Sequence, residues 1–283
     1  MSLDRNQAAR ELLAFYLEAG VDAVLGETAV DRFADIADAA PRPVIGRLAD
    51  EAPRAADPPA GSRPTLDRSR PAAPIAAPIT LPPDTAVMAA REEAKSAQTL
   101  DQLRSILDGF TGCTLRATAT RLVFADGNPQ ARVMFVGEAP GRDEDIEGLP
   151  FVGRSGKLLD RMMAAVGLTR ANAYIANIVP WRPPGNRTPT PQESAICLPF
   201  TLRQIELVDP DVLVCLGGPS AQTLLGSREG ILRTRGRWFA FATGSREIRA
   251  TATLHPAYLL RQPLQKRLAW RDFLAIKKTL EAP

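Results

Sequence analysis

Short, continuous apolar runs alternate with helical patterns over much of the chain. The apolar runs lie at 132–136, 173–179, 212–216 and 248–254, and the helical patterns at 156–166, 191–207, 219–225 and 263–280. Continuous runs of this length are typical of strands buried on both faces, and apolar spacings of three and four of helices. Strands that alternate with helices form parallel sheets with right-handed crossovers. We therefore predict an α/β fold, a three-layer α/β/α sandwich around a central four-stranded parallel sheet, over residues 99–283.

The part of the chain before residue 99 has a different pattern. Residues 1–40 read as a short helical segment with amphipathic spacing, which is able to dock a protein partner or to serve only as a tether. Between residues 41 and 83 lie 11 of the 25 prolines, with abundant alanine. Such a composition buries too little apolar surface to offset the entropy of ordering. We therefore predict a Pro/Ala-rich flexible linker over residues 41–98.

Composition and charge narrow the class of protein. No apolar run approaches the ~20 residues of a membrane span, and the N-terminus lacks the apolar segment of a signal peptide, so we expect no membrane association and a cytoplasmic location. Three cysteines do not make a disulfide framework. Residues 1–40 carry 3 basic and 8 acidic side chains, whereas residues 171–283 carry 15 basic and 8 acidic. The basic C-terminal part indicates a polyanionic partner, and nucleic acid is the usual one.

Unusual polar residues follow the ends of the predicted strands. The first run breaks into a Gly- and Pro-rich loop around Glu138, the second contains Asn177, and the fourth ends at His255, the only histidine. Open α/β sheets bind ligands at the carboxyl ends of their strands. The sequence contains no cluster with metal-ligand spacing, no P-loop lysine and no G-x-S-x-G motif. A carboxylate, an amide, an imidazole and the nearby ring of Phe151 together suit recognition of a flat heterocycle.

Three long motifs occur in order between about residues 100 and 280: GEAPGRDEDIEGLPFVGRSG, NIVPWRPPGNRTPTPQE and LHPAYLLR. They resemble the signatures of the uracil-DNA glycosylase superfamily, most closely those of family four. The resemblance implies that Phe151 stacks on a flipped-out uracil and that Asn177 pairs with uracil O4 and N3–H, a pattern that cytosine reverses. It also implies that His255 donates to O2 as the base leaves, and that Glu138 orients water or stabilises the sugar cation.

The same resemblance assigns further residues to substrate and DNA. Glu144, beside Asp145, would lie near uracil C5 and exclude the methyl group of thymine. The residues expected to contact DNA are Ser155 and Ser220 at helix starts, Arg187, and Leu259 and Arg261 in the segment that would fill the gap left by the flipped base. For that last segment, ordinary packing of the final helix remains an alternative.

Two departures from the family pattern concern Glu138 and the cofactor. Ala139 stands where the best-known glycosylase family has a water-activating aspartate. Family four also lacks that aspartate, so the resemblance leaves Glu138 as the main carboxylate. Family four holds a [4Fe–4S] cluster on four cysteines; here two of those places are Cys113 and Cys197, and the others are Phe110 and Trp181. Because such a cluster needs four thiolates, we expect no cluster and no metal.

The resemblance implies a monofunctional uracil-DNA glycosylase of base-excision repair that acts as a monomer, is associated with the nucleoid when bound to DNA, and leaves an abasic site. Two alternatives stay open at this point. One is a glycosylase for other deaminated bases, such as hypoxanthine or xanthine. The other is a slow-turnover module that binds uracil-containing or abasic DNA.

Overall fold

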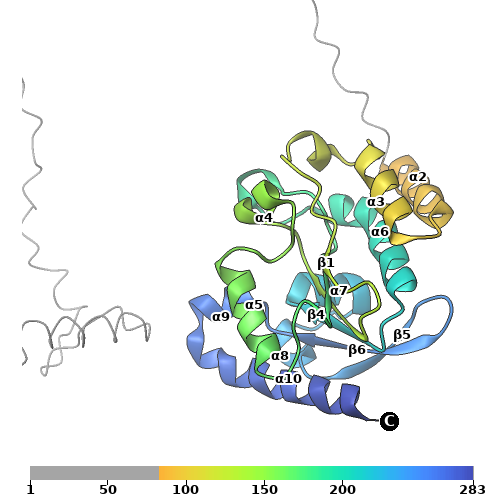
Figure 1. Ribbon diagram of the computed structural model, residues 1–283. Helices are drawn as coiled ribbons and strands as arrows, with labels where there is room; N and C mark the ends of the chain where they lie inside the picture. Colours follow the sequence, from red (N-terminus) through yellow and green to blue (C-terminus); the bar gives the residue numbers. More distant parts are fainter. Residues whose placement is uncertain (1–82, 283) are drawn as a thin grey trace, which may run out of the picture. The chain divides into compact units, whose positions relative to one another are not determined.

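A six-stranded sheet forms the centre of the computed structural model, which describes residues 83–282 (Figure 1). The strand order is β1-β3-β2-β4-β6-β5. Four central strands are parallel: β3 (Tyr174–Asn177), β2 (Val133–Gly137), β4 (Val212–Leu216) and β6 (Glu247–Thr253). Two antiparallel strands, β1 (Asp126–Gly127) and β5 (Trp238–Ala242), flank them. The predicted four-stranded parallel sheet is confirmed, and the two edge strands extend it.

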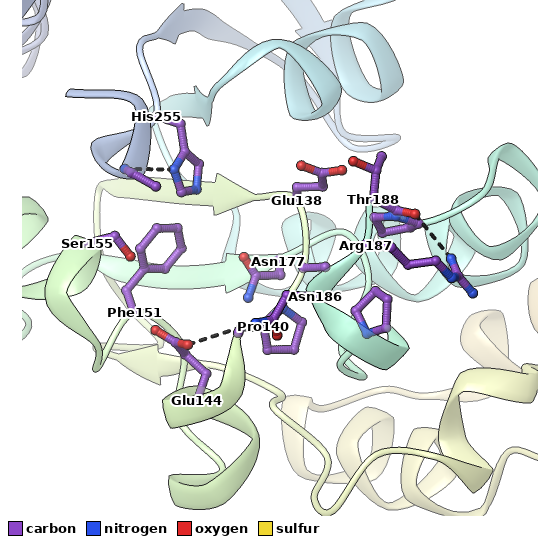
Figure 2. A pocket seen from close by; sticks show the side chains of 15 residues that line it. Glu138, Pro140, Glu144, Phe151, Ser155, Asn177, Asn186, Arg187, Thr188 and His255 are labelled. Atoms are coloured by element: carbon purple, nitrogen blue, oxygen red, sulfur yellow. Dashed lines mark hydrogen bonds between the residues drawn. The ribbon is translucent and has the colours of Figure 1, made fainter. Parts of the chain in front are cut away.

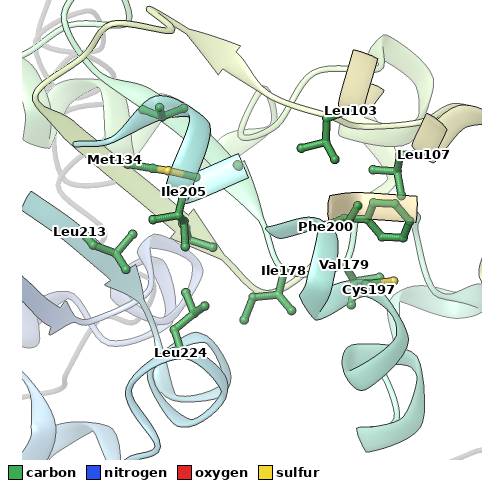
Figure 3. Close-up of a cluster of buried hydrophobic side chains, with 14 of the residues drawn as sticks. Leu103, Leu107, Met134, Ile178, Val179, Cys197, Phe200, Ile205, Leu213 and Leu224 are labelled. Atoms are coloured by element: carbon green, nitrogen blue, oxygen red, sulfur yellow. The ribbon is translucent and has the colours of Figure 1, made fainter. Parts of the chain in front are cut away.

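Helices cover both faces of the sheet, which confirms the three layers. On one face lie α2 (Pro83–Ser96), α3 (Leu100–Gly109), α6 (Pro191–Val208) and α7 (Gly218–Leu225), and on the other α5 (Arg154–Ala164) and α10 (Lys266–Glu281). Successive strand residues point to opposite faces. Met134 therefore packs in the core between the sheet and α2, α3, α6 and α7, which we call the first core and part of which is drawn in Figure 3. Phe135 packs in the second core, between the sheet and α5 and α10, where it stacks on Phe273 of α10.

Helix α2 corrects the predicted linker of residues 41–98. Ala86, Ala90 and Ala94, which follow one another at four-residue spacing, are buried in the first core, and α2 packs against α6. An alanine-rich composition does not by itself indicate disorder, because alanine is also the best helix former, and its small side chain lets two helices approach closely. The predicted boundary at residue 99 therefore lies too far along the chain, because α2 belongs to the same core as the rest of the domain. Residues 1–82, with the predicted helical segment and its docking role, lie outside the described residues.

Short helices and loops at the carboxyl ends of the parallel strands carry most of the candidate residues. Helix α4 (Arg142–Glu147) follows β2, the 3-10 helix η3 (Pro184–Asn186) follows β3, and α9 (Pro256–Arg261) follows β6. The remaining short helices are η2 (Thr114–Ala117), α8 (Ile231–Thr234) and η4 (Pro263–Gln265). Within residues 83–282, no helix has the length and apolar character needed to cross a membrane.

Candidate active site

A cavity of about 230 Å³ opens at the carboxyl edge of the sheet (Figure 2). Glu138 reaches it from the end of β2 and Asn177 from the end of β3. His255, the residue directly before α9, also lines it. Phe151 reaches it from the loop between α4 and α5. The structure thus brings together the four residues that the sequence singled out after three different strands.

Phe151 has an unusual backbone conformation. Its φ is 56°, in the left-handed region that bulky side chains rarely adopt, at a cost on the order of 1–3 kcal/mol. Gly156 permits the tight loop, because a Cβ at that position would lie 1.7 Å from the Phe151 carbonyl oxygen. The phenyl ring is buried, and its centroid lies 5.6 Å from that of His255 with an interplanar angle of 32°. Backbone strain at this position is consistent with a functional placement of the ring.

Asn177 and Glu138 each have a buried oxygen atom that finds no hydrogen-bond partner among the described residues: Asn177 Oδ1 and Glu138 Oε1. Buried polar atoms are usually paired, because an unpaired one costs about 1–3 kcal/mol. Both side chains line the cavity, so both oxygens are able to accept from a bound ligand. Burial raises the pKa of Glu138 above its usual range, which makes its carboxylate a stronger base.

The neighbouring Gly137 leaves the space that these side chains need. A Cβ there would lie 2.4 Å from Asn177 Oδ1 and 2.6 Å from Cζ of Phe151. Both distances are far below a van der Waals contact, so no other residue type fits at the end of β2 without displacing the amide or the ring.

His255 is held as a neutral hydrogen-bond donor. Its Nδ1 accepts from the backbone N–H of Ala257 at 3.1 Å, so the proton of a neutral ring lies on Nε2. Burial, together with the positive charge of Arg261, lowers the pKa of His255 to about 4. At neutral pH the imidazole is therefore uncharged and has one N–H to donate.

Glu144 lines the cavity and joins the two glycine loops that border it. One carboxylate oxygen accepts from Gly141 N and the other from Gly153 N, both at 3.1 Å. Asp145 lies elsewhere, where it accepts from the backbone and hydroxyl of Thr120. Of the expected acidic pair, only Glu144 is placed to meet a ligand.

The predicted DNA contacts divide into two groups. Ser155 and Arg187 line the cavity, and Arg187 is held by a bidentate ion pair with Glu193 at 2.7 and 2.8 Å. Arg261 lies in an adjoining groove of about 470 Å³ that also contains Ser155 and two arginines that the sequence reading missed, Arg142 and Arg154. Arginines near a catalytic cavity suit contacts to phosphates.

Two predicted DNA contacts are wrong. Ser220 is fully buried, and its hydroxyl donates to the Val136 carbonyl at 2.7 Å, so it links α7 to β2 and is not accessible to a phosphate. Leu259 is also fully buried, against Leu254 and Ala269. The next residue, Leu260, is 37% exposed and lies in the groove with Arg261. Of the two leucines, Leu260 is therefore the one that is accessible from this groove, next to Arg261.

The residues around Cys113 and Cys197 do not fit a [4Fe–4S] cluster. The thiol of Cys197 donates to Cys113 Sγ at 3.9 Å, while Phe110 and Trp181 are buried as core side chains. Phe110 packs edge to face on Phe200, with centroids 5.0 Å apart. Two thiols leave half of a four-thiolate ligand set unfilled. Across residues 83–282, no three histidine, cysteine or acidic side chains cluster in a way that suits a metal ion.

The third cysteine has a structural environment. Cys215 lies on β4 with no exposed surface, and burial raises its pKa to about 12. Its thiol therefore stays protonated and unreactive at neutral pH, as expected from its position within an apolar run.

An α/β/α sandwich with a carboxylate, an amide, a neutral imidazole and an aromatic ring around one cavity defines an enzyme that acts on a flat polar heterocycle. Residues 124–274 match the uracil DNA glycosylase superfamily, and the chain belongs to this superfamily.

Relatives support the resemblance to family four. The type-4 uracil-DNA glycosylase of Archaeoglobus fulgidus is 39% identical over 183 residues, which cover 63% of this chain and 92% of that protein. The type-4 uracil-DNA glycosylase of Thermotoga maritima is 44% identical over 152 residues, which cover 53% of this chain and 78% of that protein.

Proposed function

We propose that the chain is a monofunctional uracil-DNA glycosylase, which hydrolyses the bond between uracil and deoxyribose in DNA and leaves an abasic site for base-excision repair. One observation carries the proposal: Asn177, whose Oδ1 has no hydrogen-bond partner among residues 83–282, lines a cavity that is also lined by Phe151 and the neutral His255. The two relatives described above, which are type-4 uracil-DNA glycosylases, support it. These three residues and Glu138 come from one chain, so a monomer suffices.

Recognition depends on the hydrogen-bond pattern of the base edge. The Asn177 amide NH₂ donates to uracil O4, and its Oδ1 accepts from N3–H. Cytosine has a donor at the first position and an acceptor at the second, so both contacts would become repulsive. The Phe151 ring supplies a stacking surface, which contributes about 1–3 kcal/mol for a base on an aromatic side chain.

Bond cleavage depends on stabilising the leaving base. As the bond between C1′ and N1 breaks, its electron pair passes to the uracil ring, and negative charge develops at O2. His255 Nε2–H donates to that oxygen, and one such donor in a water-poor site contributes about 3–4 kcal/mol. The low pKa of His255 keeps the donor neutral, so the charge is stabilised by hydrogen bonding rather than by proton transfer.

Glu138 acts on the other side of the reaction. Its carboxylate orients a water molecule toward C1′ and accepts a proton as the new C–O bond forms, or stabilises the positive charge of the sugar. The raised pKa favours acceptance of a proton. Because Ala139 follows it, no second carboxylate stands next to Glu138 in the chain.

The test is base release from oligonucleotides that contain a single uracil, hypoxanthine or xanthine, in single- and double-stranded form. We expect multiple turnovers on uracil and a loss of about 100-fold or more in Asn177→Ala, because the edge contacts then disappear. No uracil release from either form of DNA would refute the proposal. Faster release of hypoxanthine or xanthine would assign another deaminated base, and one product per protein molecule would indicate a slow-turnover binding module.

A further inference from the structure

Arg170 connects three parts of the domain that meet behind the Phe151 ring. It lies in the loop between α5 and β3, and its guanidinium donates to carboxylates from β1 and α5: Asp126 Oδ2, and Asp160 Oδ1 at 2.9 Å. It also donates to two consecutive backbone carbonyls, those of Pro150 at 3.1 Å and Phe151 at 2.5 Å. The Arg170 guanidinium thus donates hydrogen bonds to four different residues.

Of the four acceptors, the Phe151 carbonyl is the one that belongs to a residue lining the cavity. Phe151 has its φ at 56°, so its peptide group is in an orientation that a phenylalanine does not adopt without support. The guanidinium holds this carbonyl directly. Arg170 itself does not line the cavity, and of its four partners only Phe151 does.

We propose that Arg170 is a positioning residue for base release, an inference that rests on the proposed function. It fixes the Phe151 carbonyl in the left-handed conformation and thereby holds the phenyl ring at its distance of 5.6 Å from the His255 ring. Only a planar fork with several donors is able to bind two carbonyls and two carboxylates at once. A lysine ammonium keeps the charge but loses this geometry.

The chain contains a matched control in Arg246. Its guanidinium also donates to two carboxylates and two consecutive carbonyls, those of Asp209 and Pro210 together with Asp209 Oδ1 and Asp211 Oδ1. It lies directly before the first residue of β6, away from the carboxyl edge of the sheet, and does not line the cavity. Arg170→Lys and Arg246→Lys therefore remove the same kind of network at two different places.

A double-variant cycle on uracil release separates positioning from a general loss of stability. We expect Arg170→Lys to lower kcat/KM about 10-fold or more, because misplacement of a contact group by a fraction of an ångström is costly, and Arg246→Lys to change it less than about 2-fold. In a Phe151→Ala background, Arg170→Lys should change kcat/KM by less than about 2-fold, because the ring that it positions is gone. Equal effects in the two backgrounds, or an Arg170→Lys variant that behaves like Arg246→Lys, would overturn the inference.

A crystal structure of the Arg170→Lys variant provides a readout that does not depend on activity. We expect Phe151 to leave the left-handed region and its ring to move away from His255. An unmoved ring overturns the positioning role even in a protein that releases no uracil. Absence of uracil release by the wild-type chain would instead refute the proposed function, so the two failures are distinguishable.

Discussion

The sulfur atoms of Cys113 and Cys197 lie 3.9 Å apart, with the thiol of Cys197 donating to Cys113. This separation is too long for a disulfide, whose S–S bond is about 2.05 Å, and both thiols are buried. The two side chains belong to the first core, together with Phe110 and Trp181. Apolar packing, with no metal, is sufficient to account for the contacts of all four residues.

We therefore expect the purified protein to contain no stoichiometric iron or sulfide, whether it is prepared with or without oxygen. Two thiolates do not complete the ligand set of a [4Fe–4S] cluster. Metal analysis and visible absorbance provide the measurement, and a Cys113→Ala/Cys197→Ala variant should keep its uracil release. Iron that is present in the wild-type protein and absent from the double variant would contradict this expectation.

Gly137→Ala should nearly abolish base release. The added Cβ would lie 2.4 Å from Asn177 Oδ1 and 2.6 Å from Phe151 Cζ, so the amide or the ring must move. A displacement of about 1 Å at a reacting site costs on the order of 100-fold in rate. Gly230→Ala is the control, because its Cβ meets nothing within 4 Å and its φ is −64°. Similar activities of Gly137→Ala and Gly230→Ala would contradict this prediction, because they would show that the added methyl group does not displace Asn177 or Phe151.

His255→Asn should slow base release at pH 7 by about 100-fold or more, since the donor to the leaving base is lost. The variant also tests the lowered pKa, and asparagine keeps the N-cap of α9. Between about pH 6.5 and about 4, the unfolded chain binds a proton at His255 that the folded chain does not, so the wild-type protein loses stability as the pH falls through this window.

Urea unfolding of the wild-type protein and of His255→Asn at pH 7 and pH 5 measures that difference. Other titrating groups cancel in the comparison. We expect the free energy of unfolding of the wild-type protein to fall relative to that of the variant at pH 5. A difference that does not change with pH would mean that the pKa of His255 is not lowered.

Leu259 and Leu260 should separate stability from DNA engagement. Leu259→Ala should lower the free energy of unfolding by about 2–5 kcal/mol, because the side chain is fully buried. Leu260→Ala should change stability by about 0.5 kcal/mol or less, yet slow uracil release from double-stranded DNA more than from single-stranded DNA, since only a duplex leaves a gap to fill. The opposite assignment of the two effects would restore Leu259 as the contact.

The sequence was sufficient for the parallel centre of the sheet and for the four cavity residues. Strands buried on both faces leave continuous apolar runs, and the residues that follow such runs in a parallel sheet meet at one edge. The edge strand β5 lacks this signal, because it is paired on one side only and Trp238 on it is 38% exposed.

The errors at the site have a common cause in geometry. On a helix, neighbouring residues point about 100° apart, so a motif that covers both Leu259 and Leu260 does not decide which one is exposed. A serine at a helix start, such as Ser220, faces either a ligand or the adjacent strand. The sequence does not single out Arg170, because the group that links it to the cavity is the backbone carbonyl of Phe151, 19 positions away. Every residue has a backbone carbonyl, so no sequence pattern indicates this contact.

The buried alanines of α2 limit how far the chain can be shortened from its N-terminal side without exposing the core. A chain cut at residue 99 keeps every cavity residue but loses Ala86, Ala90 and Ala94, and so uncovers the apolar face of α6 on which α2 packs. Exposed apolar surface of that kind favours aggregation. A fragment for crystallisation and assay should therefore include α2, and a motif match that begins further along the chain leaves this helix out of the domain.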